Sequence, residues 1–151
     1  MLIKIAKVDG TNVKLPTRAH ATDAGLDFYV PDSFKQVTLH PNESVLIPSG
    51  IKIEIPYSYM GLFLNKSSLG SKGLLIGAQV IDTFYSNEVY IDVHNVSPNN
   101  IDITPGMKIA QLVLVPIAYA TPVLVDDSEL YQDMKIENVR GLNGFGSSGS
   151  K

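Results

Sequence analysis

Hydrophobic and polar positions alternate along several short stretches of the chain. Residues 51–55 read Ile-Lys-Ile-Glu-Ile, and residues 89–94 read Val-Tyr-Ile-Asp-Val-His. A period of two residues is typical of strands with one buried face. Two apolar runs rich in β-branched residues, 45–47 and 109–115, predict further strands. Turn signals separate these segments, namely Pro31-Asp32, Pro41-Asn42, Pro48-Ser49-Gly50, Pro98-Asn99-Asn100 and Pro105-Gly106.

Helical periodicity is weak by comparison. The candidates are residues 67–73 and residues 127–135, where Leu130 and Met134 stand four positions apart. Neither segment is long enough to organise a core. The pattern therefore predicts an all-β fold, a distorted jelly-roll-like β-barrel or sandwich with one or two short helices.

Length and composition narrow this picture. With 151 residues, 44% of them hydrophobic, the chain predicts one β domain over residues 1–139, followed by a mobile C-terminal arm over residues 140–151. A net charge of -3 without a Lys/Arg run argues against binding a polynucleotide and leaves a small nucleotide as a partner. The chain has no cysteine and no apolar leader or membrane span, so we expect a soluble, cytoplasmic protein.

The C-terminal stretch combines one cation and one aromatic ring with glycine and serine. Glycine lets backbone amides approach an anion closely. Arg140 would suit a phosphate and Phe145 a flat, π-faced group. The alternative is a disordered terminus without function.

Two further segments suit an anion and its counter-ion. Asp27, close to Gly25 among strand-forming residues, would contact a hard cation such as Mg²⁺ through water, or would accept turn amides. Residues 65–73 gather hydroxyl groups, two lysines and two glycines at a strand-to-helix junction. That combination suits a phosphate, although its spacing is not that of a P-loop, and an ordinary polar loop is the alternative.

Three polar groups lie within apolar stretches. Asp82 ends such a stretch and would orient and deprotonate a water, with Tyr85 against a sugar; a turn aspartate and a core tyrosine are the alternative. Gln111 interrupts residues 109–115, and its amide must bond either to backbone or to a ligand. Asp92 and His94 share one strand face, as an acid/base pair or as a solvated polar face.

Taken in order, these segments resemble the five motifs of the trimeric deoxyuridine triphosphatases (dUTPases). The match spans the chain, and a single motif would be far less specific. The five segments are Ala24-Gly25-Leu26-Asp27, Lys66-Ser67-Ser68-Leu69, Gly77-Ala78-Gln79-Val80-Ile81-Asp82 with Tyr85, Gly106-Met107-Lys108-Ile109-Ala110-Gln111-Leu112, and residues 140–149.

The resemblance implies a jelly-roll-like subunit, a homotrimer with active sites at subunit interfaces, and Mg²⁺-dependent cleavage of dUTP to dUMP and pyrophosphate. Such an enzyme serves nucleotide metabolism and keeps uracil out of DNA. Asp82 would activate the water that attacks the α-phosphate. Mg²⁺ would be held mainly by the triphosphate, and Asp27 would reach it through water.

The resemblance also assigns substrate contacts. Backbone groups around Val80 and Ile81 would read uracil, and Tyr85 would exclude a ribose 2′-hydroxyl. The C-terminal arm of another subunit would close over the site. Phosphate contacts would come from Lys66, Ser67, Ser68, Gly70 and Gln111, and arm contacts from Arg140, Phe145, Gly146, Ser147 and Ser148.

The chain also departs from the family pattern. Lys66 stands where the family usually carries arginine after a proline, here Asn65, and Gln79 replaces a usual glycine. Residues 84–87 lose an aspartate, an arginine and a glycine. We expect activity to survive these changes. Two alternatives remain: a related dCTP deaminase, with Asp92 near the position of its glutamate, and a catalytically weak, nucleotide-gated binding protein of the same fold.

Overall fold

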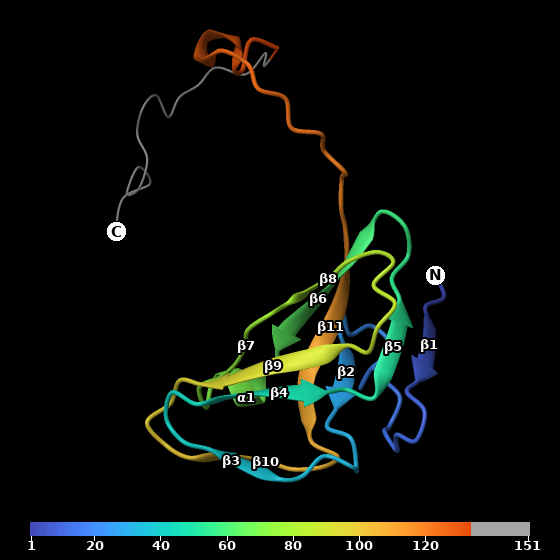
Figure 1. Cartoon of the computed structure of the whole chain (residues 1–151), viewed down its shortest axis with the longest axis vertical. Helices are drawn as coiled ribbons and strands as arrows, with labels where there is room; N and C mark the ends of the chain where they lie inside the picture. Colours follow the sequence, from blue (N-terminus) through green and yellow to red (C-terminus); the bar gives the residue numbers. More distant parts are fainter. Residues whose placement is uncertain (134–151) are drawn as a thin grey trace. The chain divides into compact units, whose positions relative to one another are not determined.

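The computed structural model describes residues 1–133 of the chain. Its contacts divide into two units, residues 1–119 and residues 120–151. All strands of the described part lie in the first unit (Figure 1). They are β1 (Lys4–Lys7), β2 (Leu26–Tyr29), β3 (Val37–Leu39), β4 (Ser44–Pro48), β5 (Ile51–Glu54), β6 (Tyr59–Asn65), β7 (Leu74–Ile76), β8 (Val80–Ile81), β9 (Tyr90–Asn95), β10 (Ile101–Ile103) and β11 (Lys108–Pro116).

The strands pair in antiparallel fashion. The largest sheet has the order β2-β11-β6-β8, and a three-stranded sheet has the order β4-β9-β7. Two smaller pairs are β1-β5 and β10-β3. The all-β prediction is confirmed. The hydrogen bonds of residues 1–133 nevertheless form four separate sheets, so the expected barrel does not close as a continuous ladder.

Period-two alternation decides which side chains form the core. In β9, Ile91 and Val93 are fully buried, while the residues between them face outward. In β5, Ile51 and Ile53 are buried and their charged neighbours are exposed. Burial of such side chains contributes about 1.5–3 kcal/mol each, so this pattern fixes the register of each strand.

The helices are shorter than the sequence predicts. Helix α1 (Ser67–Gly70) is a single turn, and a 3-10 turn covers Asp127–Glu129. Met134, the second member of the expected helical pair, lies outside the described residues. Within residues 1–133, no helix has the length and apolar character needed to cross a membrane. The expected domain boundary at residues 139–140 also lies outside the described part and stays a prediction.

Candidate functional site

Asp27 is the most constrained of the expected site residues. It lies in β2, only 5% exposed, and each of its carboxylate oxygens meets a lysine. Lys66 contacts Oδ1, and the Nζ of Lys108 lies 2.8 Å from Oδ2. Burial raises the pKa of the Asp27 carboxyl, but the hydrogen bonds and charges of Lys108 and Lys66 outweigh burial and hold this pKa below its ordinary value of 3.8. Asp27 is therefore ionised at neutral pH.

Gln111 lies beside this carboxylate. In β11 it pairs with Asp27 on β2, and its Nε2 donates to the carbonyl of Asn65, 2.9 Å away. Its Oε1 lies against Gly25, where a β-carbon would collide with it. The close approach explains why a glycine occupies position 25. The backbone alternative for Gln111 is confirmed, while its phosphate contact stays a prediction.

The second expected motif begins at the end of β6. Lys66 caps α1, and its carbonyl accepts the amide protons of Leu69 at 2.9 Å and Gly70 at 2.8 Å. Leu69 is buried and anchors the turn, whereas Ser67 and Ser68 are exposed. The two hydroxyl groups are thus presented to solvent next to the Asp27 cluster.

Asp82 has the opposite environment. It follows β8, where Val80 is 59% exposed and Ile81 is buried, and it is itself exposed. Tyr85 is 40% exposed and donates its hydroxyl proton to the carbonyl of Glu88, 3.0 Å away. Phe84 has a φ of 66° and is 87% exposed. A bulky residue rarely adopts this conformation, so the altered segment after Asp82 makes a strained turn.

The base of this hairpin is held against β9 by side chains. Asp92 accepts the Ala78 amide at 3.2 Å, and the Nε2 of His94 lies 3.0 Å from the same oxygen. The hydrogen bond with His94 lowers the pKa of Asp92 from its ordinary 3.8, against the opposing effect of burial. Gln79 donates to the Ile76 carbonyl at 3.1 Å, so its side chain bridges the loop. The Asp92–His94 pair therefore supports the hairpin.

The two groups of site residues are separated within one chain. Asn65, at the end of β6, pairs with β11 beside Asp27 and Gln111. Gly61, four residues earlier on β6, pairs with Ile81, so the two groups lie about 13 Å apart along the strand. Figure 1 shows α1 well away from β8. Asp82 and the Asp27 cluster therefore belong to different ends of β6.

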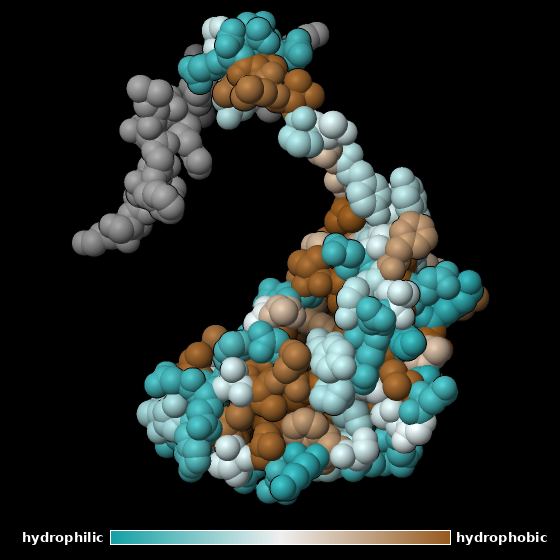
Figure 2. Space-filling model, viewed as in Figure 1, coloured by the Kyte–Doolittle hydropathy of each residue, from teal (hydrophilic) through white to brown (hydrophobic). Residues whose placement is uncertain are grey.

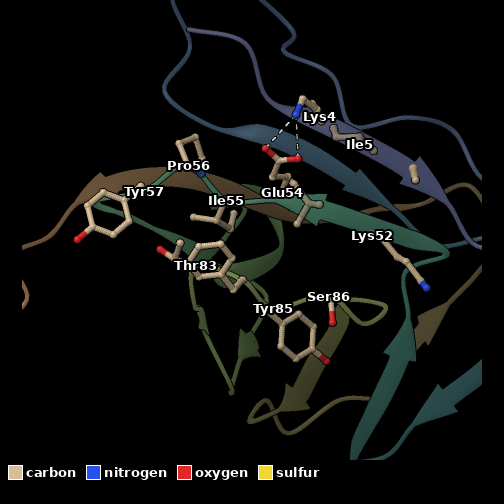
Figure 3. Close-up of a pocket in the computed structure, with 13 residues that line it drawn as sticks. Lys4, Ile5, Lys52, Glu54, Ile55, Pro56, Tyr57, Thr83, Tyr85 and Ser86 are labelled. Carbon is tan, nitrogen blue, oxygen red and sulfur yellow. Dashed lines mark hydrogen bonds and ion pairs between the residues drawn. The ribbon is translucent and has the colours of Figure 1, made fainter.

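A pocket of about 630 Å³ lies on the side of the hairpin that faces β1 and β5. It is lined by both strands, residues 55–57 and residues 83–86 (Figure 3). Tyr85 is the expected substrate contact among its lining residues, and none of the Asp27 cluster lines it. This pocket is therefore no complete nucleotide site.

Two groups of expected residues are left. Within residues 1–133 no three side chains of His, Cys, Asp or Glu come close enough to hold a metal ion directly. The ionised Asp27, with a lysine on each oxygen, suits contact with a hydrated cation better than direct ligation. The five arm residues, Arg140, Phe145, Gly146, Ser147 and Ser148, lie outside the described residues.

A family model described as dUTPase matches residues 11–149. The chain belongs to the dUTPase family. A deoxyuridine 5′-triphosphate nucleotidohydrolase of Orientia tsutsugamushi is 34% identical over the whole length of both chains. One from Azotobacter vinelandii is 38% identical, over 93% of this chain and 91% of its own.

Solved dUTPase structures agree. A mutant dUTPase of Staphylococcus bacteriophage 80alpha with dUpNHpp has a TM-score of 0.77 at 29% identity, covering 98% of each chain. A mutant dUTPase from phage phi11 of S. aureus, described with a structural Mg(II) ion, has a TM-score of 0.75 at 26% identity, covering 85% of this chain and 99% of its own. The jelly-roll-like fold implied by the resemblance is thereby confirmed.

The sequence did not assign every residue that shapes this dUTPase site. Lys108 stands inside the fourth motif, but a lysine at a strand start gives no hint of its partner. Asn65 was noted for replacing a proline; its Oδ1 accepts the Ile76 amide at 2.7 Å and ties β7 to β6. Glu88 accepts the Gly50 amide at 2.7 Å. Each of these contacts joins segments far apart in sequence, which local patterns do not reveal.

Proposed function

We propose that this dUTPase-family chain hydrolyses dUTP to dUMP and pyrophosphate, as a homotrimer that removes dUTP from the pool used for DNA synthesis. The observation that carries the proposal is the family match over residues 11–149, which includes both groups of site residues and the arm. A substrate dUTP also fits the name of the full-length relatives. The cytoplasmic location expected from the sequence stays a prediction.

Asp82 is the residue that we assign to the chemical step. Its exposed carboxylate orients a water and takes its proton as the water oxygen bonds to the α-phosphorus. The bond from the α-phosphorus to the bridging oxygen then breaks, and pyrophosphate leaves. A carboxylate that no burial holds in place can approach a nucleotide bound on another subunit.

The Asp27 cluster supplies the phosphate side. The exposed hydroxyl groups of Ser67 and Ser68 donate to phosphate oxygens, with Lys66 and Gln111 next to them and the Gly70 backbone completing the turn. Bound Mg²⁺ would neutralise charge on the triphosphate and polarise the α-phosphate. Asp27 would hold the hydration water of the ion, which the oxygen chemistry of this residue suits.

Base and sugar selection falls to the hairpin and the arm. The backbone of Val80 and Ile81 would bond uracil, and the Tyr85 ring would pack against the deoxyribose. Its hydroxyl group is already held by Glu88, so the ring has a fixed orientation for excluding a 2′-hydroxyl. The arm residues would cover uracil with Phe145 and the phosphates with Arg140, Gly146, Ser147 and Ser148.

Two observations support the homotrimer. The separation of the two groups along β6 leaves each chain with two half-sites, which a second subunit can complete. In addition, the outward face of the sheet β4-β9-β7 exposes Leu46 and Leu75, which lie opposite Asp92 and His94 in the register. Figure 2 shows apolar side chains gathered over these strands. Exposed apolar faces of this kind often mark interfaces.

The test is a substrate panel. The purified chain is incubated with dUTP, dCTP, dTTP and UTP, with and without Mg²⁺, and pyrophosphate release and base identity are followed. We expect release from dUTP that depends on Mg²⁺ and is lost in Asp82→Asn. Formation of a uracil base from dCTP would favour the deaminase instead, and saturable dUTP binding without turnover would favour the binding protein. The comparisons give no support to either alternative.

A further inference from the structure

One carboxylate with two lysines is an unusual balance of charge for a buried site. Lys66 and Lys108 each occupy a different oxygen of Asp27, and their side chains are 22% and 42% exposed. Because the two contacts are on separate oxygens, one lysine can leave while the other stays. The carboxylate would then keep a partner, which avoids the cost of a buried, unpaired charge.

The two lysines differ in their surroundings. Lys66 directly precedes Ser67 and Ser68, the hydroxyl groups proposed to meet phosphate, and its backbone is fixed by the two amide bonds that its carbonyl accepts. Its side chain can therefore turn toward a phosphate without moving the strand. Lys108 lies at the start of β11, with its Nζ 5.9 Å from the centre of the Tyr29 ring. It lies farther along the chain from these hydroxyl groups and closer to the core of the sheet.

We propose that Lys108 is a positioning residue for nucleotide binding: it keeps Asp27 paired when Lys66 leaves Asp27 for a phosphate oxygen. The inference rests on the proposed function, because it requires a bound triphosphate. Where Mg²⁺ accompanies the nucleotide, a water of the ion takes the place of Lys66 at Oδ1. Lys108 and the hydrated ion then share the carboxylate, as the two lysines do in the free protein.

The exchange has a measurable consequence for the dependence of binding on Mg²⁺. In the native chain, nucleotide binding without Mg²⁺ leaves Asp27 paired to Lys108. In Lys108→Met, the same event leaves Asp27 with no cation unless Mg²⁺ is present. The ratio of the dissociation constants without and with Mg²⁺ should therefore rise in this variant. A hydrogen bond to a charged group sets the size of the rise, at least about tenfold.

The experiment is isothermal titration calorimetry of the full chain with the imido analogue dUpNHpp, with Mg²⁺ and with EDTA. Lys14→Met is the matched control, because Lys14 also places its Nζ over the Tyr29 ring, at 4.7 Å, and has no contact with Asp27 among the ion pairs of residues 1–133. It removes the same charge and should keep the native ratio. Lys108→Arg should also keep it. Lys66→Met should weaken binding by a similar factor in both conditions.

An unchanged ratio in Lys108→Met would overturn the inference, and so would an equal rise in Lys14→Met. Lys108→Gln, which keeps the length and polarity of the side chain, is the second variant if Lys108→Met does not fold by thermal melting, and the same rise is expected. Native protein that fails to bind dUpNHpp in either condition would contradict the proposed function itself. Native binding with an insensitive ratio would contradict the lysine exchange alone.

Discussion

Asp27 and Asp82 are both carboxylates of the proposed site, and their environments are opposite. Asp27 is 5% exposed with a lysine on each oxygen, whereas Asp82 is exposed beside β8. A buried, paired carboxylate is tied to the stability of the fold, and an exposed one contributes little to it. The comparison indicates that the phosphate side is organised within one subunit, while the hairpin presents its carboxylate outward to a nucleotide held elsewhere.

The largest expected effect comes from the exposed member of the pair. Asp82→Asn should lower kcat for dUTP by about 10²–10⁴-fold, because it removes the group that takes the proton of the attacking water. Since the side chain is exposed, the free energy of unfolding should stay within about 0.5 kcal/mol of the native value. Pyrophosphate release and urea unfolding measure the two quantities. A fully active Asp82→Asn protein would remove Asp82 from the mechanism.

The buried member should show the reverse balance. Asp27→Asn leaves Lys66 and Lys108 facing a neutral amide, so we expect the free energy of unfolding to fall by about 2 kcal/mol. This lies below the loss of about 3–5 kcal/mol for a fully buried pair, because the Lys108 side chain is 42% exposed to screening solvent. Urea unfolding beside Asp82→Asn checks the contrast. Equal stability of the two variants would mean that burial does not separate the two carboxylates.

The fold was predictable where one face of a strand is buried. The alternation in residues 51–55 and 89–94 predicted β5 and β9, because solvent on one side and core on the other impose a period of two. Closure of the barrel was not predictable, since pairing between distant strands has no local signature. Helix α1 ends at Gly70, earlier than residues 67–73 suggested, because short helices depend on tertiary contacts such as that of Leu69.

Residue types at the site were predictable, and their partners were not. The motif order located Asp27, Lys66 and Gln111, and the structure brings these three together. It places Asp82 away from them, which the linear order of motifs cannot show. The second lysine on Asp27 comes from position 108, 81 residues along the chain (108 − 27). Such contacts follow from strand pairing, which the sequence gives only as a set of possibilities.

The support beneath the hairpin gives a smaller test of the same contrast. A β-carbon at Gly77 would collide with the carboxylate of Asp92 and the imidazole of His94. Gly77→Ala should therefore displace both side chains and break the hydrogen bond to Ala78, for a loss of about 1–2 kcal/mol in the free energy of unfolding. Because the hairpin carries Asp82, kcat should fall as well.

Gly70→Ala is the matched control for this change in stability. Its β-carbon would meet Asn65 no closer than 3.4 Å, which is ordinary contact, and Gly70 has no positive φ. Thermal melting should therefore separate Gly77→Ala from Gly70→Ala. Similar melting temperatures for the two proteins would show that Asp92 and His94 rotate away without cost.

The smallest expected effect is the pH dependence of the Asp92–His94 pair. The pKa of Asp92 is lowered in the fold, first by its hydrogen bond with His94. A carboxyl with a lowered folded pKa stabilises the protein above its unfolded pKa, and that contribution is lost as the pH falls through the folded pKa. With an ordinary value of 3.8, the contribution should be complete at pH 6 and should decline below about pH 4.

Asp92→Asn isolates this contribution. The side chains of Asp92 and His94 are 27% and 44% exposed, so solvent screening limits the loss at pH 6 to less than about 1 kcal/mol. Melting curves of the native and variant proteins between pH 3 and pH 6 should therefore converge toward the acid end. A gap that stays constant across this range would show that the Asp92 carboxylate holds the hairpin through shape alone, and that the charge of the pair adds nothing to the difference between the two regions.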